Sequence, residues 1–333
     1  MFVRVHCCPI GDVFRSGLLK SDNIPTGVFL KGFERTFKPF VVLTHMPLNY
    51  SILNAKSIIL PAYEEIEFYL VGCGGTGSWL APSLGRIART LERQGKNTTL
   101  IFIDADIVEQ KNVLRQNFCD AEIGLNKAQT LALRSSLSWG IRIEALPDSF
   151  SPDIVARDYY HREHKLKILI GCVDNALARQ SIASAISQYQ SWHTRNILTE
   201  LWWLDCGNHA NSGQILIGSH LSTELDAYQF HQLGCTKLPA PCLQHPELLE
   251  PKPEELSETN ISCAELALLN TQSFTINQRI AAEAASYLVQ LTIGKLNRLA
   301  TYLDLDSGCT NSTFITEDAI AKIIANAKSP AKN

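Results

Sequence analysis

No C-x-x-C pair occurs among the ten cysteines of this sequence. Structural zinc sites commonly draw their ligands from such pairs, so we expect no structural zinc. Several cysteines, among them Cys73, Cys172 and Cys206, lie inside apolar, strand-like runs. In a reducing compartment such residues usually serve as small core side chains.

Long apolar runs and a strong charge of either sign are also missing. No stretch approaches the ~20 apolar residues that a membrane helix needs, and Pro9 and Asp12 interrupt the start of the chain before a signal peptide could form. The net charge of −3 and the pI of about 6.3 argue against a protein that coats nucleic acid. We therefore expect a cytoplasmic protein without membrane or nucleic-acid partners.

What the chain does contain is a regular alternation of strand-like runs and helical spacing, beginning at residue 66. Its 333 residues are 45% hydrophobic, which is enough for one large domain. The run Leu166–Cys172, apolar apart from Lys167, is typical of a strand in a parallel sheet covered on both faces. The sequence thus predicts an α/β fold, with a doubly wound, Rossmann-like mixed sheet and helices on both faces. The expected strands are 66–71, 99–103, 141–146, 166–172, 201–206, 214–218 and 301–305, and the expected helices are 78–94, 127–139, 176–189 and 276–296.

Two segments differ from this alternating pattern. Residues 1–65 hold short apolar runs broken by prolines, which predicts an N-terminal extension of short strands and turns. Residues 66–333 form the predicted main domain. Within it, residues 219–262 are rich in proline and glutamate with little periodicity, so we expect a mobile crossover segment there.

A glycine-rich loop stands between the first predicted strand and helix of the main domain, with glycines at 72, 74, 75 and 77. Without side chains, backbone N–H groups can approach a phosphate, and the helix N-terminus adds partial positive charge. A tight turn without a ligand is the less frequent alternative in this context. Asp104 ends the next strand, where a carboxylate can accept hydrogen bonds from ribose hydroxyls or simply cap a turn.

Polar and basic side chains follow Asp104. Asn112, Arg115 and Gln116 stand just beyond the expected ribose position, from which they can reach a triphosphate, and Lys127 opens the next helix. Taken singly, such a basic residue is more often a solvated surface side chain. A dehydrogenase, the commoner owner of a glycine loop, has no need of this set.

A second acidic position follows the buried strand 166–172. Asp174 and Asn175 come directly after it, at the sheet edge that also holds the glycine loop and Asp104. A carboxylate there can hold Mg²⁺ that bridges phosphates. Capping of the next helix by either side chain is an equally favoured alternative.

Together these patterns resemble one protein family. In order they are G-x-G-G-x-G, D-x-D…N-x-x-R-Q, G-x-x-K-A and D-N-x-x-x-R, the last ending at Arg179. This series resembles the ThiF/MoeB/HesA family, which is related to the ubiquitin-activating enzymes, over roughly residues 60–300. The phrase 272–277 also resembles the ThiF-like proteins of PRTRC systems. The paired zinc cysteines usual in the family are missing here.

The resemblance implies ATP-dependent adenylation of the C-terminal glycine carboxylate of a small ubiquitin-like or sulfur-carrier protein by a homodimer. ATP and Mg²⁺ would be required. Arg115 and Lys127 would stabilise charge on the phosphates, Asp104 would bind the ribose and Asp174 would position Mg²⁺. The remaining nucleotide contacts would come from the glycine loop and from Asn112, Gln116 and Asn175.

A covalent step is the least determined part of this prediction. The resemblance places Cys263 where family members carry a cysteine for sulfur chemistry, and Cys235 is a competitor that we expect to be exposed. Arg15 and Arg35 are candidates, by location alone, for an arginine that reaches into a partner subunit. The sequence leaves open two other functions, a catalytically silent ATP-binding module and an NAD-dependent oxidoreductase, as well as the carrier's identity and the fate of its adenylate.

Overall fold

The computed structural model describes residues 49–156, 165–192, 198–228, 230–251 and 275–328. All of them belong to one compact unit, Asn49–Asn333. Most of the predicted N-terminal extension, together with Arg15 and Arg35, therefore lies outside the described residues. The proposed boundary at residue 65 and the mobility of residues 219–262 stay predictions.

A single eight-stranded sheet organises the unit, in the order β10-β9-β6-β5-β4-β1-β2-β3. The five strands from β3 to β5 run parallel, and β6, β9 and β10 are antiparallel additions. The predicted doubly wound, mixed sheet is confirmed. Its strands are β1 (Glu65–Val71), β2 (Asn97–Ile103), β3 (Ile143–Leu146), β4 (Lys165–Gly171), β5 (Leu201–Asn208), β6 (Ser212–Gly218), β9 (Arg298–Asp304) and β10 (Thr310–Phe314).

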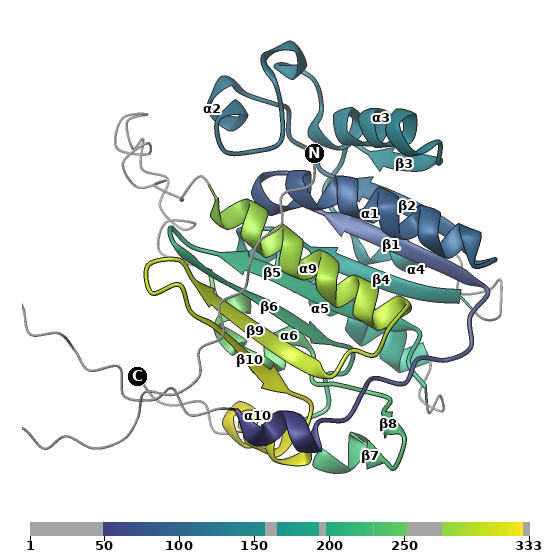
Figure 1. The fold of residues 1–333 in the computed structure, drawn as a ribbon, viewed down its shortest axis with the longest axis vertical. Helices are drawn as coiled ribbons and strands as arrows, with labels where there is room; N and C mark the ends of the chain where they lie inside the picture. Colours follow the sequence, from purple (N-terminus) through teal and green to yellow (C-terminus); the bar gives the residue numbers. More distant parts are fainter. Residues whose placement is uncertain (1–48, 157–164, 193–197, 229, 252–274, 329–333) are drawn as a thin grey trace, which may run out of the picture. The chain divides into compact units, whose positions relative to one another are not determined.

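Helices cover both faces of this sheet. Figure 1 shows α1 and α9 crossing the near face, with α5 and α6 behind the strands. Contacts between elements place α3 beside α1 on the near side and α4 against α5 on the other. The longer helices are α1 (Gly75–Arg93), α3 (Lys127–Trp139), α5 (Ala176–Trp192), α9 (Ile276–Thr292) and α10 (Glu317–Lys328), and the short ones are α2 (Gln110–Val113), α4 (Pro152–Ala156) and α6 (Pro241–Gln244).

Alternating side chains of the central strands supply the two halves of the core. On β1, Phe68 and Leu70 join the cluster under α1, α3 and α9, whereas Tyr69 and Val71 join the one under α5. Because successive side chains of a strand point to opposite faces, a central strand covered on both sides is mostly apolar. This accounts for the largely apolar runs at β1 and β4, in which the buried Glu67 and Lys167 form an ion pair with each other.

Several elements differ from the predicted ones. Helix α9 ends at Thr292, before Gly294, and not at Leu296 as we expected. Strand β10 and helix α10 had no predicted counterpart. The described part of the 219–262 segment contains short elements: 3₁₀ turns at Leu225–Ala227 and Pro246–Leu249, strands β7 (Phe230–His231) and β8 (Gly234–Cys235), and α6.

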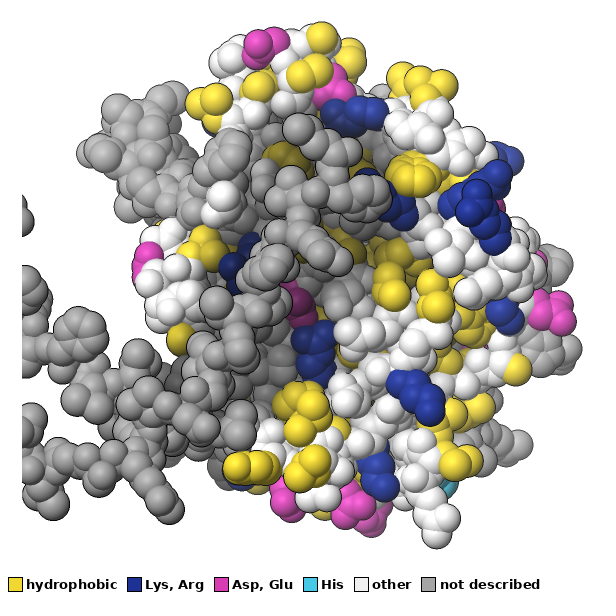
Figure 2. Space-filling model, viewed as in Figure 1, with side chains coloured by type: hydrophobic (Ala, Val, Ile, Leu, Met, Phe, Trp, Pro, Cys, Tyr) yellow, Lys and Arg dark blue, Asp and Glu magenta, His cyan; other side chains and the backbone are white. Residues whose placement is uncertain are grey.

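Two surface features complete the description. Among the described residues, no helix combines the length and the apolar character needed to cross a membrane. Figure 2 shows hydrophobic side chains gathered on the surface over α2 and the loop that follows it. Large apolar side chains there, Leu114, Ile123 and Leu125, are 78%, 38% and 53% exposed.

Candidate functional site

A cavity of about 410 Å³ opens at the carboxyl ends of the parallel strands. Its volume falls within the ~300–1,000 Å³ typical of small-molecule sites. Residues that end β1, β2, β4 and β5, or directly follow them, contribute to its wall. Ten of the predicted site residues line it: Gly72, Gly74, Gly75, Asp104, Asn112, Arg115, Gln116, Lys127, Asp174 and Asn175. Gly77 lies within α1 and does not line the cavity, and Cys263 is outside the described residues.

The loop between β1 and α1 is shaped by close backbone approaches. Gly72 has a φ of +89°, and a Cβ on it would lie 2.6 Å from the Cys172 carbonyl oxygen. A Cβ on Gly77 would lie 1.9 Å from the carbonyl oxygen of Gly72. Glycine is required at both positions, because any side chain would push the loop away from β4 or from the start of the helix.

Asp104 binds the loop through both carboxylate oxygens. The Cys73 N–H donates to Oδ2 over 2.6 Å, and the Asp106 N–H donates to Oδ1 over 2.8 Å. Burial raises the pKa of this carboxyl group, although the two N–H donors act in the opposite direction. A carboxylate oxygen has more than one lone pair, so Asp104 can hold the loop and still accept a hydroxyl hydrogen bond.

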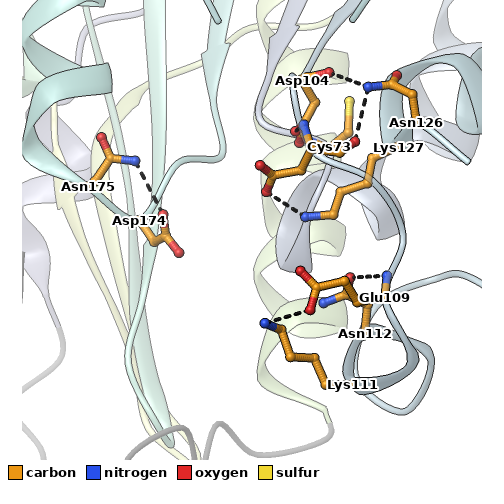
Figure 3. A network of polar contacts seen from close by, with 10 residues as sticks. Cys73, Asp104, Glu109, Lys111, Asn112, Asn126, Lys127, Asp174 and Asn175 are labelled. Atoms are coloured by element: carbon orange, nitrogen blue, oxygen red, sulfur yellow. Dashed lines mark hydrogen bonds and ion pairs between the residues drawn. The ribbon is translucent and has the colours of Figure 1, made fainter. Parts of the chain in front are cut away.

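Lys127 is buried at the start of α3, and its Nζ lies 2.8 Å from Asp106 Oδ2. The preceding residue, Asn126, donates to the carbonyls of Asp104 and Asp106 and accepts the N–H of Gln129. This cap ties the helix to the Asp104 loop, as Figure 3 shows. The ammonium group is thus fixed at the cavity wall, where its one carboxylate partner is largely exposed.

The segment around α2 presents the remaining predicted contacts. Asn112 Oδ1 accepts the Glu109 N–H over 2.8 Å in a capping box. The amide NH₂ of Asn112 has no partner among the described residues. Lys111 pairs with Glu109. The Arg115 guanidinium forms no ion pair or hydrogen bond with any described residue. Gln116 is 7% exposed, and its Oε1 is buried without a partner in the described part of the chain.

Asp174 and Asn175 stand across the cavity from Lys127 (Figure 3). Asn175 Oδ1 accepts the Ala178 N–H over 2.8 Å, so the capping alternative holds for this residue. Asp174 is exposed, and the contact found for its carboxylate among the described residues is a 3.5 Å one from the Asn175 amide. It is therefore available to a ligand.

The expectation that Cys235 is exposed was wrong. It lies in strand β8 of the β7–β8 hairpin, its side chain is fully buried, and its thiol donates to the Lys237 carbonyl over 2.8 Å. Burial raises the pKa of this thiol to about 11. The strand pairing of Ile58 with Cys235, which brings the start of the described chain over this hairpin, covers a residue that looked exposed from its Gly and Pro neighbours.

Among the polar side chains that line the cavity and that we did not assign from the sequence, three form a cluster. Thr76 opens α1, Asn208 ends β5 and Asn277 opens α9. Their side chains hydrogen-bond to one another. Thr76 lies within the glycine motif, but no local motif marks Asn208 or Asn277, because the three positions are far apart in sequence and meet only in the fold.

The donor set is suited to a nucleotide with a bound cation. The glycine loop offers backbone N–H groups with little side-chain bulk, and Arg115 is a cation at the cavity wall that has no ion-pair partner in the described part of the chain. Asp174 is an exposed carboxylate at the cavity wall, which fits Mg²⁺, since this ion usually takes one or two protein carboxylates together with substrate phosphates. Among the residues described, no group of three or more His, Cys, Asp or Glu side chains is arranged to hold a metal by itself.

Comparison with known proteins identifies the segment that builds this cavity. Residues 61–219 match the model of the ThiF family. The resemblance read from the motifs is confirmed, and the ThiF segment contains all ten predicted residues that line the cavity. Asn277 lies beyond it. The narrower resemblance to PRTRC-system proteins stays a prediction. No curated protein sequence matches the chain.

Solved structures of similar fold include PaaA, with 18% identity and a TM-score of 0.44. They also include E. coli MccB with ATP, at 15% identity and a TM-score of 0.43, and E. coli MccB with AMPCPP and MccA, at 14% and 0.44. Each alignment covers 76% of this chain and 64% of the other. The chain thus spans somewhat less than two thirds of the length of these proteins.

Proposed function

We propose that this chain catalyses the ATP-dependent adenylation of a carboxylate at the C-terminus of a small ubiquitin-like or sulfur-carrier protein. The observation that carries the proposal is the convergence of the glycine loop, Asp104, Arg115, Lys127 and Asp174 on one cavity within the ThiF segment. The glycine loop, Asp104 and Asp174 follow the ends of β1, β2 and β4, whereas Lys127 opens α3 and Arg115 follows α2. An oxidoreductase would have no use for Arg115, whose guanidinium has no partner among the described residues.

The reaction joins two anions. A carboxylate oxygen of the carrier attacks the α-phosphorus of ATP, the bond from that phosphorus to the bridging oxygen breaks, and pyrophosphate leaves with the electron pair. A terminal carboxyl group with a pKa near ~3.5 is already ionised at neutral pH, so no general base is needed. The work of the protein is to hold the two groups in line and to offset their charge.

Arg115 and Lys127 supply positive charge. The Arg115 guanidinium has no carboxylate partner in the described structure, so it can bind phosphate oxygens without breaking an ion pair. Lys127 must share its ammonium group between the Asp106 carboxylate and a phosphate. Asp106 is 70% exposed, so water can solvate it as the lysine turns to the nucleotide.

The neutral contacts follow from the hydrogen bonds already made. Asn112 uses its oxygen in the capping box and keeps its NH₂ for a phosphate oxygen. Gln116 Oε1 is a buried acceptor without a partner among the described residues. Asp104 has lone pairs free for ribose hydroxyls. Asp174, steadied by Asn175, would hold Mg²⁺, which supplies charge neutralisation at the phosphates when it is bound.

A covalent step through Cys263 is a further part of the proposal. In this step the Cys263 thiolate would attack the acyl carbon of the adenylate, forming a thioester and releasing AMP. Treatment with ATP and the carrier, followed by non-reducing mass spectrometry, tests it. Wild type should gain the mass of the carrier and Cys263→Ser should not; equal product from both would leave this cysteine without a covalent role.

A protein partner also fits the surface beside the site. Leu114, the neighbour of Arg115, is 78% exposed, and apolar surface next to a reactive group is what a protein substrate would cover. The proposal includes a homodimer and a cytoplasmic location, where ATP is available.

Binding measurements on purified protein test the proposed ligand. Calorimetry should show ATP binding that depends on Mg²⁺, and no comparable binding of NAD. The substitutions Arg115→Ala and Lys127→Ala should each lower the rate of adenylation by ~100-fold or more, the scale seen when one preorganised charge contact is lost. Asp174→Ala should bind ATP with little response to Mg²⁺. Preference for NAD, or variants that match wild type, would contradict the proposal.

A further inference from the structure

Asn277 is a fully buried polar residue that reaches the cavity from outside the ThiF segment. It lies in the first turn of α9, on the near face of the sheet, and its side chain has no exposed area. Burying an amide is costly unless its donors and acceptors are bonded. The partners of this amide therefore indicate why an asparagine stands among the apolar residues of the helix.

The amide of Asn277 contacts three elements that carry the cavity. Its oxygen accepts hydrogen bonds from the Asn208 amide at the end of β5 and, over 3.5 Å, from the Thr76 hydroxyl at the start of α1. Its nitrogen donates to the backbone carbonyl of Arg115 over 3.5 Å. A Cβ on Gly75 would lie only 2.7 Å from the amide oxygen, so the glycine loop itself packs on this group.

The backbone at Arg115 depends on such contacts for its position. The Trp79 indole N–H of α1 donates to the same Arg115 carbonyl over 3.2 Å. The next turn is also tied to α1, because the Asn117 N–H donates to the Ser78 hydroxyl over 2.9 Å. Helix α2 has only four residues, and Leu114 points to solvent. Side-chain hydrogen bonds from α1 and α9 thus hold the Arg115 backbone between the exposed Leu114 and the buried Phe118.

We propose that Asn277 is a positioning residue for Arg115. Its amide holds the Arg115 backbone and the glycine-loop end of α1 in one fixed arrangement, from which the guanidinium reaches the phosphates. The role of the guanidinium rests on the proposed function; the restraint on the backbone does not. Misplacement of a reactive group by about 1 Å can lower a rate by about 100-fold, so a weak contact of this kind can have a large kinetic effect.

Hydrogen exchange tests the restraint without any assumption about activity. The variant is Asn277→Ala, and the control is Tyr287→Phe, which removes another fully buried hydrogen bond, to Thr301, from the same helix. We expect the amides of residues 115–118 to exchange about tenfold faster in Asn277→Ala and at the wild-type rate in Tyr287→Phe. Unchanged exchange in Asn277→Ala, or equal acceleration in both variants, would overturn the inference.

A double-mutant cycle then asks whether the effect passes through the guanidinium. Asn277→Ala should lower kcat for pyrophosphate exchange at least about tenfold with little change in KM for ATP, and should cause no further loss in an Arg115→Ala background. Losses that multiply would show that Asn277 acts independently of Arg115 and would overturn the inference. Wild-type protein without any exchange would instead contradict the proposed function, while the hydrogen-exchange result would still decide the restraint.

Discussion

At the scale of single residues, Asp104 illustrates how a ligand position and a structural position coincide. Its carboxylate accepts the N–H groups of Cys73 and Asp106, which fixes the glycine loop against the end of β2. Sequence reasoning found this residue as a ribose acceptor because it ends a strand. The same placement lets it order the loop, so replacing it would affect loop geometry as well as any ribose contact.

Cysteine reactivity should separate the described thiols by burial. Cys119 is exposed, whereas Cys235 is buried with a pKa raised from 9.0 to about 11. Two pKa units lower the thiolate fraction by about 100-fold, and the thiolate is the reactive form. Brief treatment of native protein with iodoacetamide at pH 8, followed by peptide mass spectrometry, should modify Cys119 well before Cys235. Equal rates of modification at both cysteines would mean that the Cys235 thiol is accessible to the reagent and would contradict its burial in the β7–β8 hairpin.

Some site residues could be predicted from the sequence and others could not, for a physical reason. Asp104 and Asp174 follow strands, Lys127 opens a helix and Arg115 follows α2, all within recognisable local patterns. Asn277 meets Arg115 across 162 positions of sequence and Thr76 across 201. Its contacts are a product of how α9 packs on α1, which no local spacing encodes.

At the scale of elements, the extent of burial determined which strands and helices could be predicted from the sequence. Strands β1 and β4 are covered on both faces and are therefore mostly apolar, apart from glutamates in β1 and lysines in β4. Helix α3 was predicted with its observed limits, Lys127–Trp139. Strand β10, with the sequence Thr-Asn-Ser-Thr-Phe, lies at the sheet edge and is largely polar. Helix α10 buries only Ile320 and Ile324, a pattern too sparse to stand out.

The glycine loop offers a matched pair of substitutions. Gly72 and Gly124 have nearly equal φ values, +89° and +86°, but a Cβ on Gly72 would meet the Cys172 backbone while one on Gly124 would meet nothing within 4 Å. Both alanine variants bear the left-handed strain of about 1–2 kcal/mol. Gly72→Ala should lose at least about 1 kcal/mol more in urea unfolding, and should lose nucleotide binding.

The control in this pair keeps the interpretation clear. Gly124→Ala should retain nucleotide binding, because Gly124 does not line the cavity and a Cβ on it would meet nothing within 4 Å. Similar stability and similar binding in the two variants would show that the approach of Gly72 to β4 is not needed for the loop's shape.

At the scale of the whole molecule, His220 should make stability depend on pH. Its Nδ1 lies 2.6 Å from the Gln190 amide, and burial, with a smaller contribution from Lys237, lowers its pKa from 6.5 to about 4. Between pH 6.5 and 4 the unfolded chain therefore binds a proton at His220 that the folded chain does not. The contribution of His220 to the free energy of unfolding is fully present above pH 6.5 and is lost as the pH falls toward 4.

Urea unfolding at several pH values measures this effect. His220→Asn keeps an acceptor near Gln190 and cannot be protonated, so its stability should fall less steeply than that of wild type between pH 6.5 and 4. Parallel curves for the two proteins would assign the acid sensitivity to other groups.

Oligomeric state is a second property of the whole molecule. The resemblance to the ThiF/MoeB/HesA family predicts a homodimer, and light scattering at micromolar concentration should give twice the 37.0 kDa of one chain. An active protein with the mass of a single chain would exclude the dimer.

The most direct measurement of the central claim is ATP–pyrophosphate exchange. Wild-type protein should incorporate labelled pyrophosphate into ATP when supplied with Mg²⁺ and with a small protein ending in glycine that is encoded beside its own gene. Exchange should fall by ~100-fold or more in Arg115→Ala, in line with loss of one charge contact, and should stay at the wild-type level in Gly124→Ala. Absence of exchange in wild type, or undiminished exchange in Arg115→Ala, would contradict adenylation at this cavity.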